Sequence, residues 1–337
     1  MKKSVVMGLT VLPALFAVSA MGAQTINAAG ATFPAPIYQK WFAEYKTAHP
    51  DVQINYQPIG SSGGIRQLIE GTIDFGASDM PVADDQLKQM KVRTLHFPTV
   101  MGAIVLTYNV PGVTGALKLT PEAISGIYLG TIAKWDDAAI KGANPGVKLP
   151  SKEIEVVHRS DGSGTTFVFA DYLSKISADW KSKAGTNASP SWPVGLGGKG
   201  NDGVAGLVKQ TPNSIGYVEL FYALQNKMAF ADIKNAAGKF VTPSLEGVTA
   251  AAAGSKDLPE DFRGSINNAP GAASYPISTF TYLLIPTEYK DATKAAAIKG
   301  FLTWMLTTGQ KDAQGLSYAP LPKNLVAKVQ KQLAQIK

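Results

Sequence analysis

Short apolar runs with the alternation of strands recur along the chain, and most are followed by a run with helical spacing. The runs predicted to be strands are 52–56, 73–77, 101–108, 154–158, 215–218 and 279–285. The runs predicted to be helices are 65–69, 84–90, 167–173, 202–210, 243–253, 293–307 and 321–336. A further helix is predicted to begin at Pro121 with Thr120 as its cap, residues 228–242 predict a β-hairpin, and 254–276 predict a loop. This alternation is typical of an α/β protein.

Two of the predicted strands, 101–108 and 279–285, are strongly apolar. We expect both to carry the chain between two lobes, because a chain of 337 residues is long enough to form two cores. Lobe I would then comprise 24–104 and 280–337, with both ends of the mature chain, and lobe II would comprise 105–279. A ligand would bind in the cleft between the lobes, which a hinge can close.

The first 23 residues have the three parts of a secretory signal peptide. Lys2 and Lys3 are basic, residues 5–18 form an apolar run too short to span a membrane, and 19–23 are mostly small. We expect cleavage after Gly22 or Ala23 and export to the periplasm. The alternative is an uncleaved anchor.

Composition narrows the class of protein further. The sequence has no cysteine, which excludes disulfides and a lipid-carrying cysteine, so we expect a soluble periplasmic protein that folds on its core alone. The net charge of +7 becomes +5 once the two signal lysines are removed. That excess suits an acidic small ligand, although it can also serve solubility alone. Because no arginine-rich run is interleaved with aromatic residues, we do not expect nucleic-acid binding.

Three turns of small residues, 30–33, 60–64 and 161–166, each follow a strand-like run and open a predicted helix. The start of a helix exposes unpaired N–H groups and the positive end of the helix dipole. Glycine lets the backbone approach a ligand closely, and serine or threonine adds a hydroxyl donor. One such turn is a common helix cap, but three of them with Arg159 nearby predict a pocket for an oxyanion.

Two aspartates belong to the same hypothesis. Asp79 ends the strand-like run 74–79 and is either a helix cap before Pro81 or part of the anion pocket. In that pocket a carboxylate is useful only if the ligand carries a proton, as phosphate does at neutral pH and sulfate does not. Arg159 and Asp161 form either a surface ion pair or a pair in which Asp161 aims the Arg159 fork at ligand oxygens.

Two motifs raise the alternative of an enzyme. Residues 60–64 match the nucleophile elbow G-x-S-x-G, with Ser62 as nucleophile, and the candidate bases are His49, His96 and His158. That pattern is short and most such turns are caps, so we predict no enzyme, and a secreted serine hydrolase or phosphoesterase remains the alternative of another class. Residues 195–200 match G-x-G-x-x-G but follow a proline-rich stretch, which predicts a glycine-rich loop at the cleft rim and no dinucleotide site. Because cysteine is absent and the histidines are scattered, we expect neither a metal nor a cofactor.

The motifs together resemble the periplasmic phosphate-binding proteins of high-affinity phosphate ABC transporters. The segments that carry the resemblance are 30–36, 60–64, 74–79 and 159–165, with further similarity in 128–130, 134–137, 195–203 and 215–219. The likeness covers nearly all of the mature chain and is weakest between 228 and 274. Four separate motifs in the family's order are far more specific than any one of them.

The resemblance implies a fold, a site and a partner. The fold is the two-lobed periplasmic binding protein of type II, with two crossover strands and the ligand in the cleft between the lobes. Phosphate would be bound without metal, Asp79 would accept its proton, and Asp161 would orient Arg159. The implied phosphate-binding residues are Thr32, Phe33, Ser61, Asp79, Arg159, Ser163, Gly164 and Thr165.

By the same resemblance, the protein would deliver phosphate to an ABC permease of the inner membrane and help to report phosphate sufficiency. We expect a monomer that contacts the permease transiently. The nearest alternative is a receptor for another tetrahedral oxyanion, namely arsenate, sulfate or molybdate. A purely adhesive protein would leave the three donor turns unexplained.

Overall fold

The computed structural model describes residues 24–255 and 258–337. The predicted signal peptide, 1–23, lies outside the described residues. Within the described ranges, no helix combines the length and the apolar character needed to cross a membrane.

One nine-stranded sheet runs through the molecule in the order β2-β1-β3-β12-β4-β8-β6-β7, and β9 pairs with β4 at one side. The strands of this sheet are β1 Gln24–Gly30, β2 Val52–Pro58, β3 Phe75–Ser78, β4 Thr94–Asn109, β6 Glu155–Arg159, β7 Leu196–Gly198, β8 Ser214–Glu219, β9 Ala229–Phe230 and β12 Ser278–Pro286. A second, three-stranded sheet contains β5 Lys118–Leu119, β10 Asp232–Lys234 and β11 Phe240–Val241. All six predicted strands are present.

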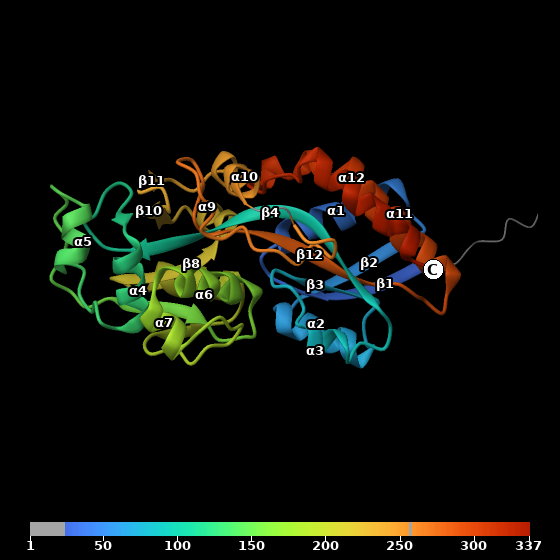
Figure 1. Ribbon diagram of the computed structural model, residues 1–337, viewed down its shortest axis with the longest axis horizontal. Helices are drawn as coiled ribbons and strands as arrows, with labels where there is room; N and C mark the ends of the chain where they lie inside the picture. The colour runs from blue at the N-terminus through green and yellow to red at the C-terminus, as the bar shows by residue number, and fades with distance from the viewer. Residues whose placement is uncertain (1–23, 256–257) are drawn as a thin grey trace, which may run out of the picture.

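The strand β4 joins two lobes. Its residues 94–103 pair with β12, and its residues 104–109 pair with β8. Figure 1 shows the two groups of elements side by side along the long axis, with β4 running from one into the other. The strand β12 pairs only with β3 and with the first part of β4, so the chain returns to lobe I just before Ser278. The exact boundaries after residues 104 and 279 stay a prediction.

The helices flank the sheet in both lobes. Lobe I carries α1 Ala35–Ala48, α2 Ser61–Glu70, α3 Asp84–Leu87, α11 Ala292–Thr307 and α12 Lys323–Gln332, with the 3-10 turns Gly309–Asp312, Gln314–Leu316 and Leu333–Gln335. Lobe II carries α4 Pro121–Leu129, α5 Ala138–Ala143, α6 Gly164–Ile176, α7 Ala178–Lys183, α8 Gly200–Gln210, α9 Leu220–Gln225 and α10 Leu245–Gly254. The predicted cap of α4 is confirmed, because the Thr120 side chain accepts the Ala123 N–H at 3.2 Å.

Aromatic side chains pack in the interior of both lobes. In lobe I, Phe42 packs against Phe301 with ring centroids 5.2 Å apart. In lobe II, Phe169 stacks on Tyr217 at 4.5 Å. Trp41 in lobe I and Trp180 in lobe II are fully buried. Large aromatic side chains are therefore buried on both sides of the crossing, within one hydrophobic core cluster that extends through both lobes.

The predicted glycine-rich loop at 195–200 is wrong in part. Residues 196–198 form β7, which pairs in parallel with β6 alone, and α8 begins at Gly200. The preceding prolines exclude a central strand, but a strand at the sheet edge needs only one neighbour. The chain therefore contains a fourth strand–turn–helix unit beside the three that the sequence indicated.

Candidate functional site

The strand–helix turns of both lobes converge between the lobes. The strands β1, β2 and β3 are mutually parallel in lobe I, as are β6, β7 and β8 in lobe II, so the carboxyl ends of each set lie at one edge. The turn after β1 carries Thr32, the turn after β2 carries Ser61, and Asp79 follows β3 directly. The turn after β6 carries Ser163, Gly164 and Thr165. All of these side chains are buried.

Contacts join these turns both within lobe I and across the cleft. The Asp79 N–H donates to Ser61 Oγ at 3.2 Å, and Thr165 Oγ1 lies 3.5 Å from Asp79 Oδ2. A Cβ added at Gly164 would overlap Ser61 Oγ. The structure therefore brings all the sequence-predicted residues of both lobes into one buried cluster. Phe33 belongs to it through its backbone only, because its ring packs in the core against Tyr318.

Arg159 is buried and is held by a single carboxylate. Its Nε donates to Asp161 Oδ1 at 2.7 Å and its Nη2 to Asp161 Oδ2 at 2.5 Å, and its side chain is 1% exposed. The surface ion pair considered as an alternative is therefore wrong. In the part of the chain that the structure describes, Arg159 Nη1 is buried without a hydrogen-bond partner. A buried donor of this kind is costly unless a ligand supplies an acceptor.

Asp161 has a second partner besides Arg159. Its Oδ1 accepts the Gly200 N–H at 3.0 Å, at the start of α8. Burial acts to raise the pKa of Asp161, but the hydrogen bonds from Arg159 and Gly200 and the Arg159 charge outweigh it and leave the pKa below its ordinary value. Asp161 is therefore a stable anion that fixes the orientation of the Arg159 guanidinium.

Asp79 is the one carboxylate among the predicted ligand contacts. Its Oδ1 accepts the Thr281 hydroxyl at 2.9 Å, and its side chain is almost completely buried. Burial raises the pKa of Asp79 to about 7, although the Thr281 hydrogen bond and the Arg159 charge act to lower it. Asp79 caps no helix, since α3 begins at Asp84 with Ala83 before it, so the helix-cap alternative is wrong.

Helix starts supply the donors. Ser163 is the N-cap of α6, and its Oγ accepts the Thr166 N–H at 3.0 Å. A hydroxyl that accepts at the cap still has its own proton to donate.

Gly60 precedes α2 with a φ of 91°, and a Cβ there would overlap Asp161 Oδ2. Glycine is therefore needed at position 60 both for the backbone conformation and for the approach of Asp161.

The two lobes touch at the rim of the cluster. The Ser62 N–H donates to Gly162 O at 3.1 Å, and the Tyr222 hydroxyl donates to Thr32 O at 2.6 Å. A Cβ added at Gly162 would overlap Ser62 Cβ. The structure is thus the state in which the lobes are closed over the site.

Sequence reasoning missed three residues of this cluster, namely Asn201, Tyr222 and Thr281. Thr281 lies in the apolar strand β12 close to two other buried hydroxyl residues, Ser278 and Thr279, so nothing in the sequence distinguished it. Asn201 lies in the first turn of α8, and recognising a fourth strand–turn–helix unit would have drawn attention to that turn but not to Asn201 itself. Tyr222 carried no local signal, because its partner Thr32 lies 190 positions away in sequence.

The histidines considered as bases for Ser62 have other partners. His96 Nε2 accepts the Val82 N–H at 3.0 Å. His158 stacks on Trp192 with ring centroids 4.8 Å apart. The described residues contain no group of three or more histidine, cysteine, aspartate or glutamate side chains arranged to hold a metal.

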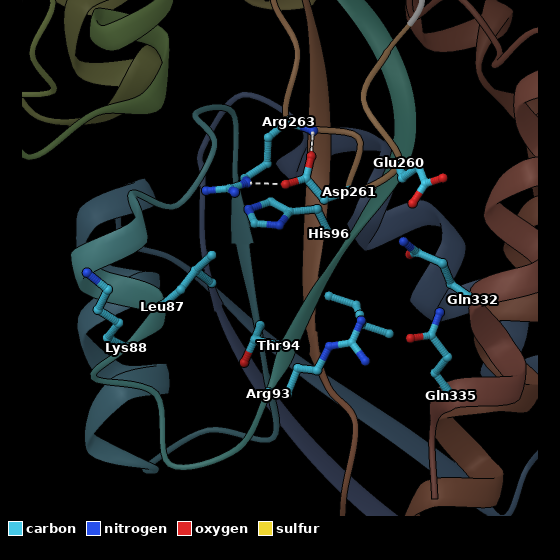
Figure 2. A pocket seen from close by; sticks show the side chains of 11 residues that line it. Leu87, Lys88, Arg93, Thr94, His96, Glu260, Asp261, Arg263, Gln332 and Gln335 are labelled. Carbon is cyan, nitrogen blue, oxygen red and sulfur yellow. Dashed lines mark hydrogen bonds and ion pairs between the residues drawn. The ribbon is translucent and has the colours of Figure 1, made fainter.

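A second polar cavity of about 570 Å³ lies away from the turns, lined by residues of lobe I and by Glu260, Asp261 and Arg263 of the segment 105–279. Figure 2 shows Arg93 pointing into it and Arg263 paired with Asp261. Arg263 also donates to Asp84 at 2.6 Å, so its charge is balanced on two sides. The cavity lacks both the helix N-termini and the fixed arginine of the first cluster.

His96, which lines this cavity, makes folding depend on pH. Burial, together with the nearby Arg263 charge, lowers the pKa of His96 from its ordinary 6.5 to about 4. Because the unfolded chain then binds the proton at a higher pH than the folded protein, we expect the free energy of unfolding to fall by about 3 kcal/mol as the pH falls from 6.5 to 4. His96→Gln keeps an acceptor for the Val82 N–H. Between pH 7 and pH 4, we expect its free energy of unfolding to fall by about 3 kcal/mol less than that of the parent.

The measurement is denaturant unfolding at the two pH values. His49→Gln is the matched control, because His49 is exposed, and it should follow the parent. An unchanged pH dependence in His96→Gln would contradict this role.

Comparisons with known proteins agree with the geometry of the site. The sequence matches the family described as the PBP superfamily domain over residues 17–308. It is 48% identical over 307 residues to the phosphate-binding protein PstS of Xylella fastidiosa, covering 90% of this chain and 84% of that one. It is 44% identical to PstS of Pasteurella multocida, covering 96% and 94%. A solved high-affinity periplasmic phosphate-binding protein with bound phosphate shares the fold, with a TM-score of 0.75, 21% identity, and coverage of 92% and 94%. The chain therefore belongs to the PBP superfamily, in the family of the phosphate-binding proteins PstS.

Proposed function

We propose that this protein captures inorganic phosphate between its two lobes and delivers it to an ABC permease. The observation that carries the proposal is a buried arginine donor without a partner, Arg159 Nη1, in the same cluster as a buried carboxylate, Asp79. A cation alone would suit any oxyanion. A cation together with a carboxylate acceptor suits an oxyanion that keeps a proton, because the carboxylate can then accept a hydrogen bond from the ligand.

Each residue has a distinct role in this proposal. Arg159, aimed by Asp161, donates to two ligand oxygens, and Asp79 accepts the ligand hydroxyl. Backbone N–H groups of Phe33 and Gly164 complete the set of neutral donors at the helix starts. The hydroxyl donors are Thr32, Ser61, Ser163 and Thr165.

The nearest alternative is another tetrahedral oxyanion. Sulfate and molybdate carry no proton at neutral pH, so Asp79 would face them charge against charge. Arsenate carries one, so the same geometry accommodates it. The alternative of another class, a secreted serine hydrolase acting through Ser62, is less well supported, because His96 and His158 are engaged elsewhere.

The cellular setting is part of the proposal. We place the mature protein in the periplasm after cleavage near Gly22 or Ala23, as a monomeric receptor without cofactor or enzymatic activity. Support comes from the signal-like N-terminus and from a structural neighbour described as periplasmic. The permease would recognise the closed form, and the protein would thereby help to report phosphate sufficiency.

Titration calorimetry on ligand-stripped protein of residues 24–337 tests the function. We expect one phosphate to bind per chain and sulfate to give no heat at the same concentrations. Failure of well-folded protein to bind phosphate would overturn the proposal, and ester hydrolysis at Ser62 would be tested next.

Closure can be tested separately at Gly162. We expect Gly162→Ala to weaken phosphate binding about tenfold or more, because the new Cβ would overlap Ser62 and hold the lobes apart. Small-angle scattering should show the parent becoming more compact with phosphate and the variant failing to do so. The control is Gly142→Ala, also in lobe II, where an added Cβ meets nothing within 4 Å. Full compaction of Gly162→Ala at parental affinity would contradict this closed geometry.

A further inference from the structure

The buried side chain of Asn201 lies between two of the proposed phosphate-binding threonines, one from each lobe. Its Nδ2 donates to Thr32 Oγ1 at 2.8 Å and to Thr165 Oγ1 at 3.1 Å. Its Oδ1 accepts the Glu219 N–H at 2.9 Å. Because a backbone N–H can only donate, this last contact fixes which end of the amide is oxygen. Both amide protons are therefore directed at the two threonine hydroxyls.

Two donors at Thr32 decide what its hydroxyl can do. Besides the amide of Asn201, the Asn201 backbone N–H donates to Thr32 Oγ1 at 3.3 Å. A hydroxyl has two acceptor positions and one proton. With both acceptor positions occupied, Thr32 can act toward a ligand only as a donor.

Thr165 is restricted in a similar way. Its oxygen accepts from Asn201, and the oxygen facing it at 3.5 Å is the buried carboxylate of Asp79. Its proton is therefore directed toward Asp79 Oδ2, the oxygen that the proposed function assigns to the ligand hydroxyl. Donors that are already oriented for the charge of an oxyanion do not have to reorganise when it binds.

We propose that Asn201 is a positioning residue that makes the Thr32 hydroxyl an obligate donor, orients the Thr165 hydroxyl by filling one of its two acceptor positions, and thereby adapts the closed site to a ligand face made only of acceptors. The inference rests on the proposed function, because it assigns no contact of its own to phosphate. It also links the lobes, since Thr32 lies in lobe I and Asn201 in lobe II. The Asn201 amide therefore completes the donor set only when the lobes close.

A double-mutant cycle tests the proposal, with phosphate affinity measured by calorimetry. We expect Asn201→Leu, which keeps the volume and removes the amide, to weaken phosphate binding about tenfold to a hundredfold, because two oriented donors lose their orientation. In the Thr32→Val/Thr165→Val background, Asn201→Leu should change the affinity less than about threefold, because no hydroxyl remains to be oriented.

The matched control is Asn144→Leu in the same lobe. Asn144 is also buried, donates through its amide to Lys118 O and Ile140 O, and accepts the Lys118 N–H. Its loss should reduce stability without changing phosphate affinity. Equal effects of Asn201→Leu in both backgrounds would show a merely structural role and overturn the proposal. Absence of phosphate binding by the parent would instead contradict the proposed function.

Discussion

Replacing Asp79 by asparagine is expected to convert a phosphate-selective site into one that also binds sulfate. In the parent, sulfate would bring two negative charges against a buried carboxylate and offer it no proton. In the variant, the amide oxygen can still accept the Thr281 hydroxyl, and the amide nitrogen takes the place of Asp79 Oδ2 and donates to sulfate. We expect sulfate affinity to rise by two to three orders of magnitude, or about 3–4 kcal/mol.

The affinity for phosphate should fall far less in the same variant, about tenfold, because phosphate can turn its hydroxyl away and accept a hydrogen bond from the amide. Calorimetry with both ions at neutral pH measures the ratio of the two affinities. Asp74→Asn is the matched control, because it removes the same charge at the other end of the segment 74–79, where Asp74 pairs with Lys294 at 2.8 Å. If sulfate binding stays undetectable in Asp79→Asn, Asp79 is not the residue that distinguishes phosphate from sulfate.

Changing Arg159 is expected to have the largest effect on phosphate affinity itself. Arg159→Lys keeps the charge, but its three N–H donors lie on one nitrogen and cannot reproduce the planar fork that holds both oxygens of Asp161 and leaves Nη1 for the ligand. Truncating one partner of a buried charge pair typically costs about 2–5 kcal/mol. We therefore expect phosphate affinity to fall at least a hundredfold in Arg159→Lys, and further in Arg159→Met, where Asp161 is left unpaired.

Arg263 provides the control for this experiment. Like Arg159, it is held by carboxylates, but by two of them, Asp261 and Asp84. It lies beside the second cavity (Figure 2). Arg263→Lys should lower stability and leave phosphate affinity unchanged in calorimetry. An Arg159→Lys variant with parental affinity would mean that the guanidinium fork does not contact phosphate.

Local patterns in the sequence were sufficient for many of the elements and for part of the candidate site, but they missed the short helices α5, α7 and α9. A capping Thr120 followed by Pro121 marks the start of α4, and the apolar run that became β4 marks the crossing between the lobes. Turns rich in glycine and serine after strands mark the helix starts, because the same residues that cap a helix also donate to an anion. For this reason Ser163 could be identified from its neighbours in the chain.

The residues that were missed depend on distant partners. Thr281 reaches Asp79 across 202 positions, and Asn201 reaches Thr32 across 169. The order of strands in the sheet places β12 beside β3, and the contact between the lobes places α8 beside the turn after β1. A threonine in an apolar strand or an asparagine in a first helical turn has no local pattern that distinguishes such a role.

The most direct test of phosphate binding between the lobes is a crystal structure of residues 24–337 with phosphate. We expect one phosphate between the lobes, with Arg159 Nη1, Thr32 and Ser163 as donors and Asp79 Oδ2 within hydrogen-bond distance of one oxygen. Phosphate found only elsewhere, for instance beside Arg93 in the second cavity, with Arg159 Nη1 still without a partner, would contradict this expectation.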